Sequence, residues 1–408
     1  MGKLAVTGGK PVRTKPWPSW PIRDDREVEL VTEATRKGPW SFDGPKEWEF
    51  GEKFAAFSGT QCGLCVANGT VALQLSLEAL DIGAWDEVIV PGLTWQATAA
   101  AALDINAIPI LVDVEPDTYT IDPNALKAAI TDRTKAIIPV HLYGCMADMD
   151  SILAIAKEHN LKVIEDCSHQ HGSQWNGKGV GSMGDLGAFS LQETKLLTSG
   201  EGGIVLMNDR DLMLRVYSLR NCGRLYKDTE GQHIQSGNYR ITEFQAAVLL
   251  AGLERLESQT LLRDENAQYL NSKLAQIDGI EPMKRRPEAT RQAYYYFTFR
   301  YDPEKWQGLA PAKFREALTA ETGFEAEHLY QPLNNCDLYQ PLTKRRYHIN
   351  EEYWKAIDPR RFSLPVCERV HNIEGVGMHH AALMGTKDDM NDIVRGIEKV
   401  RDNLGELL

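Results

Sequence analysis

Short apolar runs alternate with stretches of helical periodicity between Gly63 and Asn208, and this alternation constrains the fold more than any other feature of the chain. The apolar runs are rich in valine and isoleucine and cover residues 64–67, 88–91, 108–114, 136–140, 162–167, 187–191 and 203–208. Helical periods lie between the first five runs, at residues 70–80, 97–103, 123–129 and 148–159. Strands that alternate with helices form a mainly parallel sheet covered by helices on both faces. We therefore predict an α/β fold.

The remaining residues predict two further parts. The first 47 residues are rich in proline and tryptophan, with Trp17-Pro-Ser-Trp20-Pro21 at their centre, and this composition predicts an extended arm. After the alternating region, helical periods cover residues 210–220, 241–278, 311–322 and 387–403, and an aromatic strand pattern covers 294–300. We predict an N-terminal arm over 1–47, a large domain with a mainly parallel mixed sheet over 48–260, and a smaller α+β domain over 261–408.

Composition argues against several classes of protein. A net charge of −12 argues against a nucleic acid or an anionic membrane as partner. No stretch approaches the ~20 apolar residues of a membrane span, and the first 15 residues lack the apolar core of a signal peptide. Most of the seven cysteines lie in apolar runs, which indicates reduced thiols in a cytoplasmic protein. Cys62 and Cys65 form one isolated C-x-x-C pair, for which coincidence is a better interpretation than a zinc or redox site.

Two strand ends carry residues suited to charged ligands. Asn68-Gly69-Thr70 leads from a predicted strand into a helix, whose first N–H groups can bind an anion, although Asn and Thr also serve as ordinary helix caps. Asp166 ends the run at 162–167, where a buried carboxylate is costly unless a cation such as a protonated pyridine nitrogen accompanies it. A structural salt bridge or a cap is the alternative. His169 can bond that carboxylate, face a cofactor or be structural.

A lysine and an aromatic residue complete the pattern. Lys195 lies between the strand that contains Ser190 and the loop Gly200-Glu-Gly-Gly. A lysine that forms an imine must lie beside an aldehyde and must be able to lose a proton. Trp95 follows the run at 88–91 and could stack on a flat ring. Taken singly, a surface lysine and a core tryptophan are the ordinary interpretations.

The order and spacing of these elements resemble the DegT/StrS-type sugar and cyclitol aminotransferases of fold type I, over nearly the whole chain from Trp17 to the C-terminal helix. The resemblance implies a pyridoxal 5'-phosphate-dependent aminotransferase in which Lys195 forms the Schiff base and Asp166 binds the pyridine nitrogen. It implies further cofactor contacts from His169, Trp95, Gly69, Thr70 and Ser190. In the segment Ser236-Gly-Asn-Tyr-Arg240, it implies that Asn238 reaches the phosphate from the other subunit of a homodimer.

Three short segments, at 17–21, 291–295 and 378–380, resemble the glutamine-dependent scyllo-inosose and 2-deoxy-scyllo-inosose aminotransferases of aminoglycoside pathways. This finer resemblance implies L-glutamine or L-glutamate as amino donor and a keto-cyclitol as acceptor. It makes Trp20, Tyr295, His379 and His380 candidate substrate contacts. Alternatives are a nucleotide-linked keto-sugar as acceptor and an enzyme similar to 3-amino-5-hydroxybenzoate synthase.

Other functions stay open or are set aside. The G-x-G-x-x-G match at 179–184 follows a polar turn and precedes a strand, so it does not predict a dinucleotide site. A cofactor-binding sensor without turnover would normally add a DNA-binding segment, and none is visible. A pyridoxal-phosphate enzyme with dehydrating or aromatising chemistry remains open. The residue that binds the donor carboxylate is unassigned among Arg220, Arg240 and Arg291.

Overall fold

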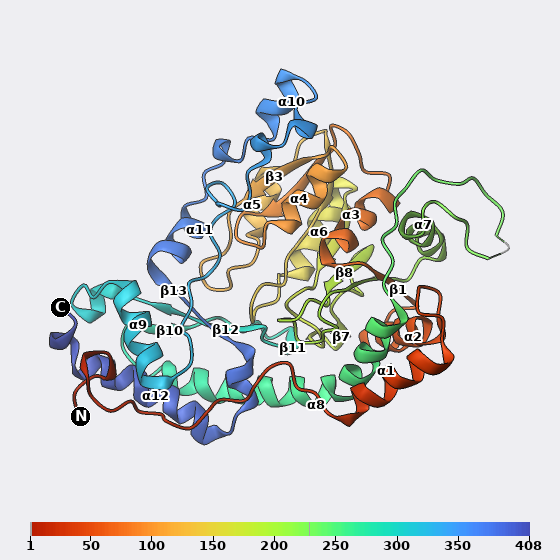
Figure 1. Ribbon diagram of the computed structural model, residues 1–408. Helices are drawn as coiled ribbons and strands as arrows, with labels where there is room; N and C mark the ends of the chain where they lie inside the picture. Colours follow the sequence, from red (N-terminus) through yellow and green to blue (C-terminus); the bar gives the residue numbers. More distant parts are fainter. Residues whose placement is uncertain (1, 228) are drawn as a thin grey trace.

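The computed structural model describes residues 2–227 and 229–408, and its largest element is a seven-stranded mixed sheet (Figure 1). In spatial order the strands are β1 (Cys62–Val66), β9 (Gly203–Met207), β8 (Leu186–Ser190), β5 (Lys162–Asp166), β4 (Thr134–Ile137), β2 (Glu87–Pro91) and β3 (Ile108–Val112). Only β9 runs antiparallel to its neighbours in this sheet. The prediction of an α/β fold with a mainly parallel mixed sheet is therefore confirmed.

The helices that follow these strands form where the periodicity predicts them. They are α3 (Gly69–Ala79), α4 (Ala97–Asp104), α5 (Pro123–Ala128), α6 (Met149–His159) and α7 (Arg210–Arg220). α3 packs against β8, β9 and α4, whereas α6 packs against β5 and α5. Strand and helix bounds differ from the predicted ones by at most a few residues. Because the parallel strands share one direction, their carboxyl ends lie along one edge of the sheet.

The N-terminal region departs from the predicted extended arm at Asp25. From there the chain forms α1 (Asp25–Lys37) and then α2 (Pro45–Ser58), and both pack on α8 (Glu243–Leu274). α1 begins with a capping box between Asp24 and Glu27, and it buries Leu30 and Ala34, one helical turn apart. The prediction of an extended arm to residue 47 was wrong, because the proline-rich start masked this helix start signal.

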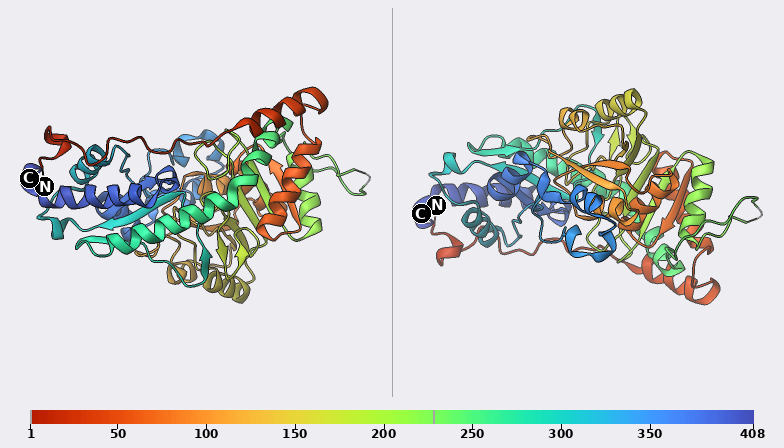
Figure 2. Two further views of the ribbon diagram at one scale, coloured as in Figure 1. Left: turned by 90° about the horizontal axis from the view of Figure 1, so that it is seen from below. Right: turned by 90° about the horizontal axis from the view of Figure 1, so that it is seen from above.

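A second, smaller apolar core lies around a three-stranded antiparallel sheet of β10 (Ile280–Pro282), β12 (Tyr296–Tyr301) and β13 (Gly375–His379). The helices α9 (Pro311–Thr322) and α12 (Lys387–Asp402) pack on each other beside it. A third small sheet joins β11 (Ala289–Arg291), β6 (Gln174–Trp175) and β7 (Lys178–Gly179). Both termini lie at the far end of the smaller core (Figures 1 and 2), where the Leu4 N–H donates to the Glu406 carboxylate.

The two cores are joined by α8 and by a returning segment. The single 32-residue helix α8 contributes Leu249 to the large core and Leu270 to the small one, and it runs along both parts of the molecule (Figure 2). Residues 329–370, with the short helices α10 (Glu351–Ala356) and α11 (Pro365–Arg369), return to the large core. Among the described residues, no helix combines the length and the apolar character that crossing a bilayer requires.

Candidate active site

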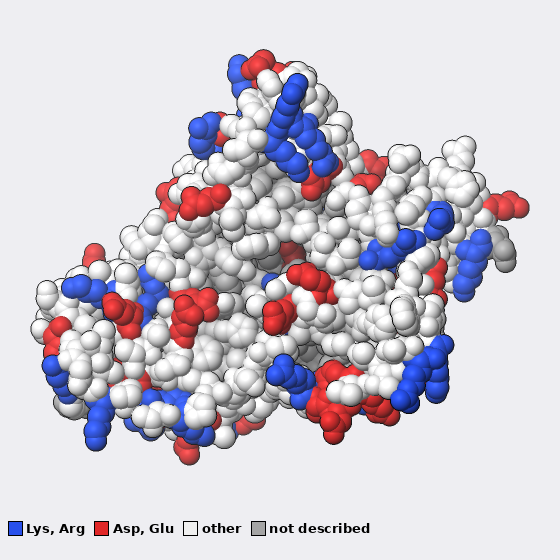
Figure 3. Space-filling model, in the orientation of Figure 1, with Lys and Arg blue, Asp and Glu red and all other residues white. Residues whose placement is uncertain are grey.

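A pocket of about 680 Å³ lies at the carboxyl ends of the large sheet's strands. Its walls include residues that follow β1, β2, β5 and β8 and two tyrosines of β12 and its approach. Six of the predicted cofactor residues line it together with the predicted lysine: Gly69, Thr70, Trp95, Asp166, His169, Ser190 and Lys195. On the face of the molecule shown in Figure 3, acidic and basic side chains are mixed and no continuous basic field forms. Residues distant in sequence thus meet in one cavity.

Lys195 lies in the loop after β8, with its amine turned toward Tyr295. The amine nitrogen is 4.1 Å from the centre of the Tyr295 ring. Burial of the amine lowers the pKa of Lys195 to about 8, although the nearby Asp166 carboxylate raises it. About a tenth of the amine is then unprotonated at pH 7, far more than for an ordinary lysine, and the unprotonated amine is the state that attacks a carbonyl carbon.

Asp166 ends β5 with its carboxylate held in the pocket. Asp166 is only 5% exposed. One carboxylate oxygen accepts a hydrogen bond from the Thr98 hydroxyl at 2.9 Å, and the other accepts from the Ser168 N–H at 3.2 Å. Both donors are neutral, so these contacts fix the carboxylate without balancing its charge. The arrangement leaves a buried anion directed to a site where a cation would be stabilised.

His169 is buried beside these two residues, and its ring lies 4.0 Å from the Tyr295 ring, centre to centre. Burial and the Lys195 charge hold the pKa of His169 well below its usual range, so the ring is neutral. Its Nδ1 accepts the Tyr143 N–H at 3.2 Å, which places the ring proton on Nε2. Nε2 lies 3.4 Å from the Tyr330 hydroxyl.

The start of α3 combines the two interpretations of Asn68-Gly69-Thr70. Asn68 is the N-cap, because its side-chain oxygen accepts the Val71 N–H at 2.9 Å. The N–H groups of Gly69 and Thr70 have no acceptor within the helix and remain available to an anion. A Cβ at Gly69 would lie 2.7 Å from the Ser190 Cβ, so the two segments are in close contact. The site therefore offers a capped helix start and an anion cradle together.

Several candidate residues lie outside the pocket walls. Asn238 is exposed, and its side-chain oxygen accepts from Arg240 at 2.7 Å. Trp20, His379 and His380 contact the backbone just before Lys195 instead of lining the cavity. Tyr295, by contrast, lines it. Trp95 is 46% exposed, with its ring at the cavity wall.

None of the three candidate arginines lines this pocket in its own chain. Arg220 is buried against Glu47 and Asp43, and Arg291 is paired with Glu257. The guanidinium of Arg240 lies over the Phe42 ring. Within its own chain, each of the three arginines is therefore engaged by other side chains.

Sequence reasoning missed two tyrosines and a threonine of the site. Tyr330 lines the pocket, with its N–H bonded to the Tyr143 hydroxyl at 2.8 Å, and Tyr296 lines it from β12. Thr98 supports Asp166. Tyr330 follows a stretch without periodicity, so no local signal identified it. Thr98 lies one helical turn after Thr94, and only the fold shows that its hydroxyl faces Asp166.

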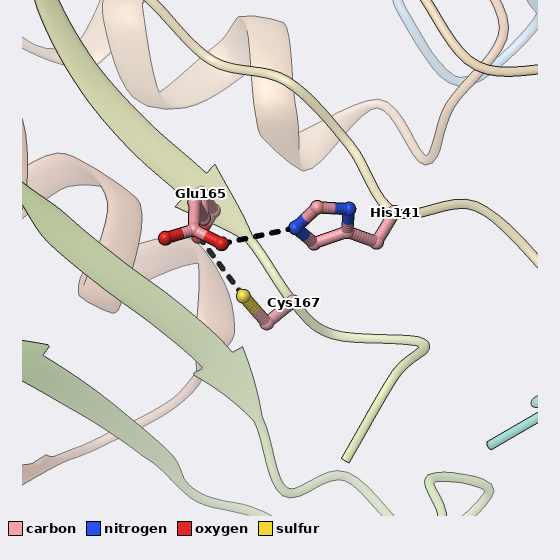
Figure 4. A group of neighbouring side chains, drawn as sticks. All are labelled: His141, Glu165 and Cys167. Carbon is pink, nitrogen blue, oxygen red and sulfur yellow. Dashed lines mark hydrogen bonds and ion pairs between the residues drawn. The ribbon is translucent and has the colours of Figure 1, made fainter. Parts of the chain in front are cut away.

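Behind the pocket, His141, Glu165 and Cys167 form a buried cluster whose geometry could suit a metal (Figure 4). Glu165 already accepts the N–H groups of Gly181, Met183 and Gly184, at 2.7 to 2.9 Å. Its other contact is His141 Nε2 at 3.1 Å.

Hydrogen bonding occupies the remaining atoms of this cluster as well. His141 Nδ1 accepts the Ala147 N–H, and burial raises the pKa of the Cys167 thiol well above its usual range. A protonated thiol and an occupied imidazole are poor metal ligands. The glycine motif at 179–184 thus binds an internal carboxylate, and the cluster anchors β5 just before Asp166.

Comparisons with known proteins show which family and which relatives the chain is similar to. Residues 21–374 match the model of the DegT/DnrJ/EryC1/StrS aminotransferase family. The chain is 42% identical over 420 residues to the L-glutamine:2-deoxy-scyllo-inosose aminotransferase of Streptoalloteichus tenebrarius, and the match covers 99% of each chain. It is 39% identical over 421 residues to the L-glutamine:scyllo-inosose aminotransferase of Streptomyces griseus, again over 99% of each. The solved structure of 3-amino-5-hydroxybenzoic acid synthase matches with a TM-score of 0.82 and 32% identity, covering 97% of this chain and 100% of that one.

Proposed function

We propose that this chain, which belongs to the DegT/DnrJ/EryC1/StrS aminotransferase family, transfers an amino group from L-glutamine to a keto-cyclitol of the scyllo-inosose or 2-deoxy-scyllo-inosose type. The enzyme is a pyridoxal-phosphate-dependent aminotransferase. The observation that carries the proposal is the meeting of Lys195 and Asp166 in one pocket, in a chain that matches glutamine:keto-cyclitol aminotransferases over 99% of its length.

The pocket fits the cofactor on its own chemistry. The buried Asp166 carboxylate has only neutral hydrogen-bond donors among the described residues, and a protonated pyridine nitrogen would complete its partners. The free N–H groups at the start of α3, with the Thr70 and Ser190 hydroxyls, would hold the phosphate. The accessible face of Trp95 suits a flat ring. Lys195 would carry the covalent attachment.

When bound, pyridoxal phosphate supplies an electron sink for the negative charge that develops on the carbon losing its proton. Lys195, once free, has an amine whose lowered pKa lets it take that proton and return it at another carbon. Asp166, held by Thr98 and Ser168, would be the partner of the ring nitrogen. The lowered pKa of His169 keeps its ring neutral, so this ring adds no positive charge to the pocket.

We propose that the enzyme acts as a cytoplasmic homodimer. Support for a dimer comes from apolar side chains exposed on and near α1 and α8, where Val28 is 65%, Trp40 61% and Leu261 54% exposed. Asn238 is exposed and lies outside its own chain's pocket, which is consistent with the proposed contact to a partner's phosphate site. All seven cysteines are free, which supports a reducing compartment.

The test is product analysis with purified enzyme, pyridoxal phosphate and L-glutamine. We expect an aminocyclitol from scyllo-inosose or 2-deoxy-scyllo-inosose, together with the 2-oxo acid derived from glutamine. Amine formation only on a nucleotide-linked keto-sugar, or a dehydrated or aromatised product, would replace the proposed acceptor. Bound cofactor without any product would favour a sensor.

A further inference from the structure

Two consecutive peptide planes before Lys195 are held by side chains from distant parts of the chain. The Glu193 carbonyl accepts the Trp20 indole N–H at 3.0 Å. The Thr194 carbonyl faces Nε2 of His380 at 3.1 Å and Nε2 of His379 at 3.3 Å. These partners lie more than 170 residues away in sequence, in the N-terminal segment and at the end of β13.

The second of these planes contains Lys195 itself. A trans peptide is planar, so the Thr194 carbonyl shares one rigid plane with the Lys195 nitrogen and Cα. On the other side of that plane, the Lys195 N–H donates to the Gln192 carbonyl at 2.9 Å. Whatever fixes the Thr194 carbonyl therefore fixes the position of the Lys195 Cα, from which the side chain extends.

The protonation states of the two histidines suit this contact. Burial lowers the pKa of His379 to about 4 and holds that of His380 well below its usual range, so both rings are neutral. His379 Nδ1 accepts the Ala381 N–H at 3.3 Å, which leaves its proton on Nε2. A carbonyl oxygen has two lone pairs and can accept from both rings.

Neighbouring contacts lock the same turn. The Thr194 hydroxyl lies 2.8 Å from the Tyr295 hydroxyl, and the Tyr295 carbonyl accepts the His380 N–H at 3.2 Å. Trp20 packs edge-on against the His380 ring, with centres 4.4 Å apart. Tyr295 in turn lies against the Lys195 amine.

We propose that His379 and His380 are positioning residues that hold the Thr194–Lys195 peptide, and so keep the Lys195 amine over Tyr295 in the pocket. This role rests on the proposed function, in which Lys195 moves a proton in both half-reactions. It differs from a substrate contact, because neither histidine lines the pocket and His380 is fully buried. We call these contacts of His379 and His380 with the Thr194 carbonyl the clamp, and Trp20 extends it to the preceding peptide through the Glu193 carbonyl.

The chain offers a matched pair of variants. In a His→Gln change the amide nitrogen takes the place of Nε2, whereas in His→Asn it takes the place of Nδ1 and falls short of Thr194. We compare His379→Gln/His380→Gln with His379→Asn/His380→Asn as holoenzymes. Each half-reaction is followed separately, with L-glutamine alone and then with the keto-cyclitol alone. The pH midpoint of the near-visible absorption of the lysine-bound cofactor is a second readout.

We expect the double Asn variant to slow both half-reactions by a similar factor, about 10- to 100-fold, as small misplacements of catalytic groups do. Its absorption midpoint should shift, while the double Gln variant keeps the wild-type midpoint and most of its rate. A loss confined to the keto-cyclitol half-reaction would show substrate contacts and overturn the proposal. Unchanged rates and an unchanged midpoint in the double Asn variant would overturn it equally.

A second variant covers failure of the double Asn protein to fold. Trp20 is half-buried, and Trp20→Phe removes only the indole N–H that donates to the Glu193 carbonyl. We expect the absorption midpoint to shift in the same direction as in the double Asn variant, but by less. No shift there would contradict the clamp. If the wild type binds cofactor but transfers no amino group to any cyclitol, the proposed acceptor fails, whereas the absorption comparison still tests the clamp.

Discussion

The amine of Lys195 lies over the ring of Tyr295, 4.1 Å from its centre, and the same tyrosine touches both His169 and the turn that carries the lysine. Tyr295 directly precedes β12 of the smaller sheet and thereby links that sheet to the carboxyl edge of the large sheet. The reactive amine is consequently positioned by both parts of the molecule.

The lowered pKa of Lys195 predicts how the apoprotein reacts with an aldehyde. Incorporation of pyridoxal phosphate should accelerate as pH rises and level off above about 8, because the neutral amine is then the dominant form. Since the Asp166 charge raises this pKa, Asp166→Asn should move the midpoint to lower pH. Stopped-flow absorbance across a pH series measures both midpoints. A wild-type midpoint near 10, as for a solvated lysine, would contradict the burial argument.

Removing the Asp166 charge should impair turnover more than binding. For Asp166→Asn we expect roughly a 10- to 100-fold loss of kcat, matching about 1.5–3 kcal/mol for a hydrogen bond to a charged group. Thr98→Val removes one donor to Asp166 but keeps the charge, so its loss should be only about a few-fold, as for a neutral hydrogen bond. Steady-state kinetics of the two variants measure both losses of kcat. Equal losses would show that the local structure around Asp166, and not its charge, determines kcat.

A methyl group at Gly69 should disturb the anion cradle. Its Cβ would lie 2.7 Å from the Ser190 Cβ, so Gly69→Ala should weaken pyridoxal phosphate binding by roughly 5- to 100-fold, the effect of about 1–3 kcal/mol of overpacking. Gly83→Ala is the control, since no heavy atom lies within 4 Å of its added Cβ. Fluorescence titration of the apoproteins compares them. Wild-type affinity in Gly69→Ala would show that the phosphate does not bind at the backbone of Gly69.

Glu165 should matter for stability, because three N–H groups and His141 converge on its carboxylate. Glu165→Gln should lower the free energy of unfolding by at least about 2 kcal/mol, since it leaves buried donors mismatched. Glu158→Gln, at an exposed pair with Lys127, should be indistinguishable from wild type in the same urea titration. Equal stability of both variants would show that the 179–184 turn does not need the carboxylate.

Periodicity predicted the large sheet and its helices closely, because buried parallel strands and amphipathic helices leave strong local patterns. The region 241–278 was predicted as helical and forms one unbroken helix, α8. The start of α1 at Asp25 was missed, although its capping box is present in the sequence.

The site was predictable only in part. Lys195 and Asp166 stood out because each residue type is unusual at its place in the pattern. The packing of Tyr330 and Thr98 around them depends on segments that meet only in three dimensions, and no single stretch of sequence records it. The contact between His380 and the Thr194 carbonyl is of the same kind.

The most direct test of the central claim is an absorption spectrum of the protein with pyridoxal phosphate, taken before and after L-glutamine, for wild type and Lys195→Ala. We predict a near-visible band in the wild type that disappears with glutamine as a 2-oxo acid is released, and that returns with a keto-cyclitol. The variant should lack the lysine-bound band and turn over no substrate. Normal turnover in Lys195→Ala, or a wild type that forms no band with supplied cofactor, would contradict the assignment of Lys195.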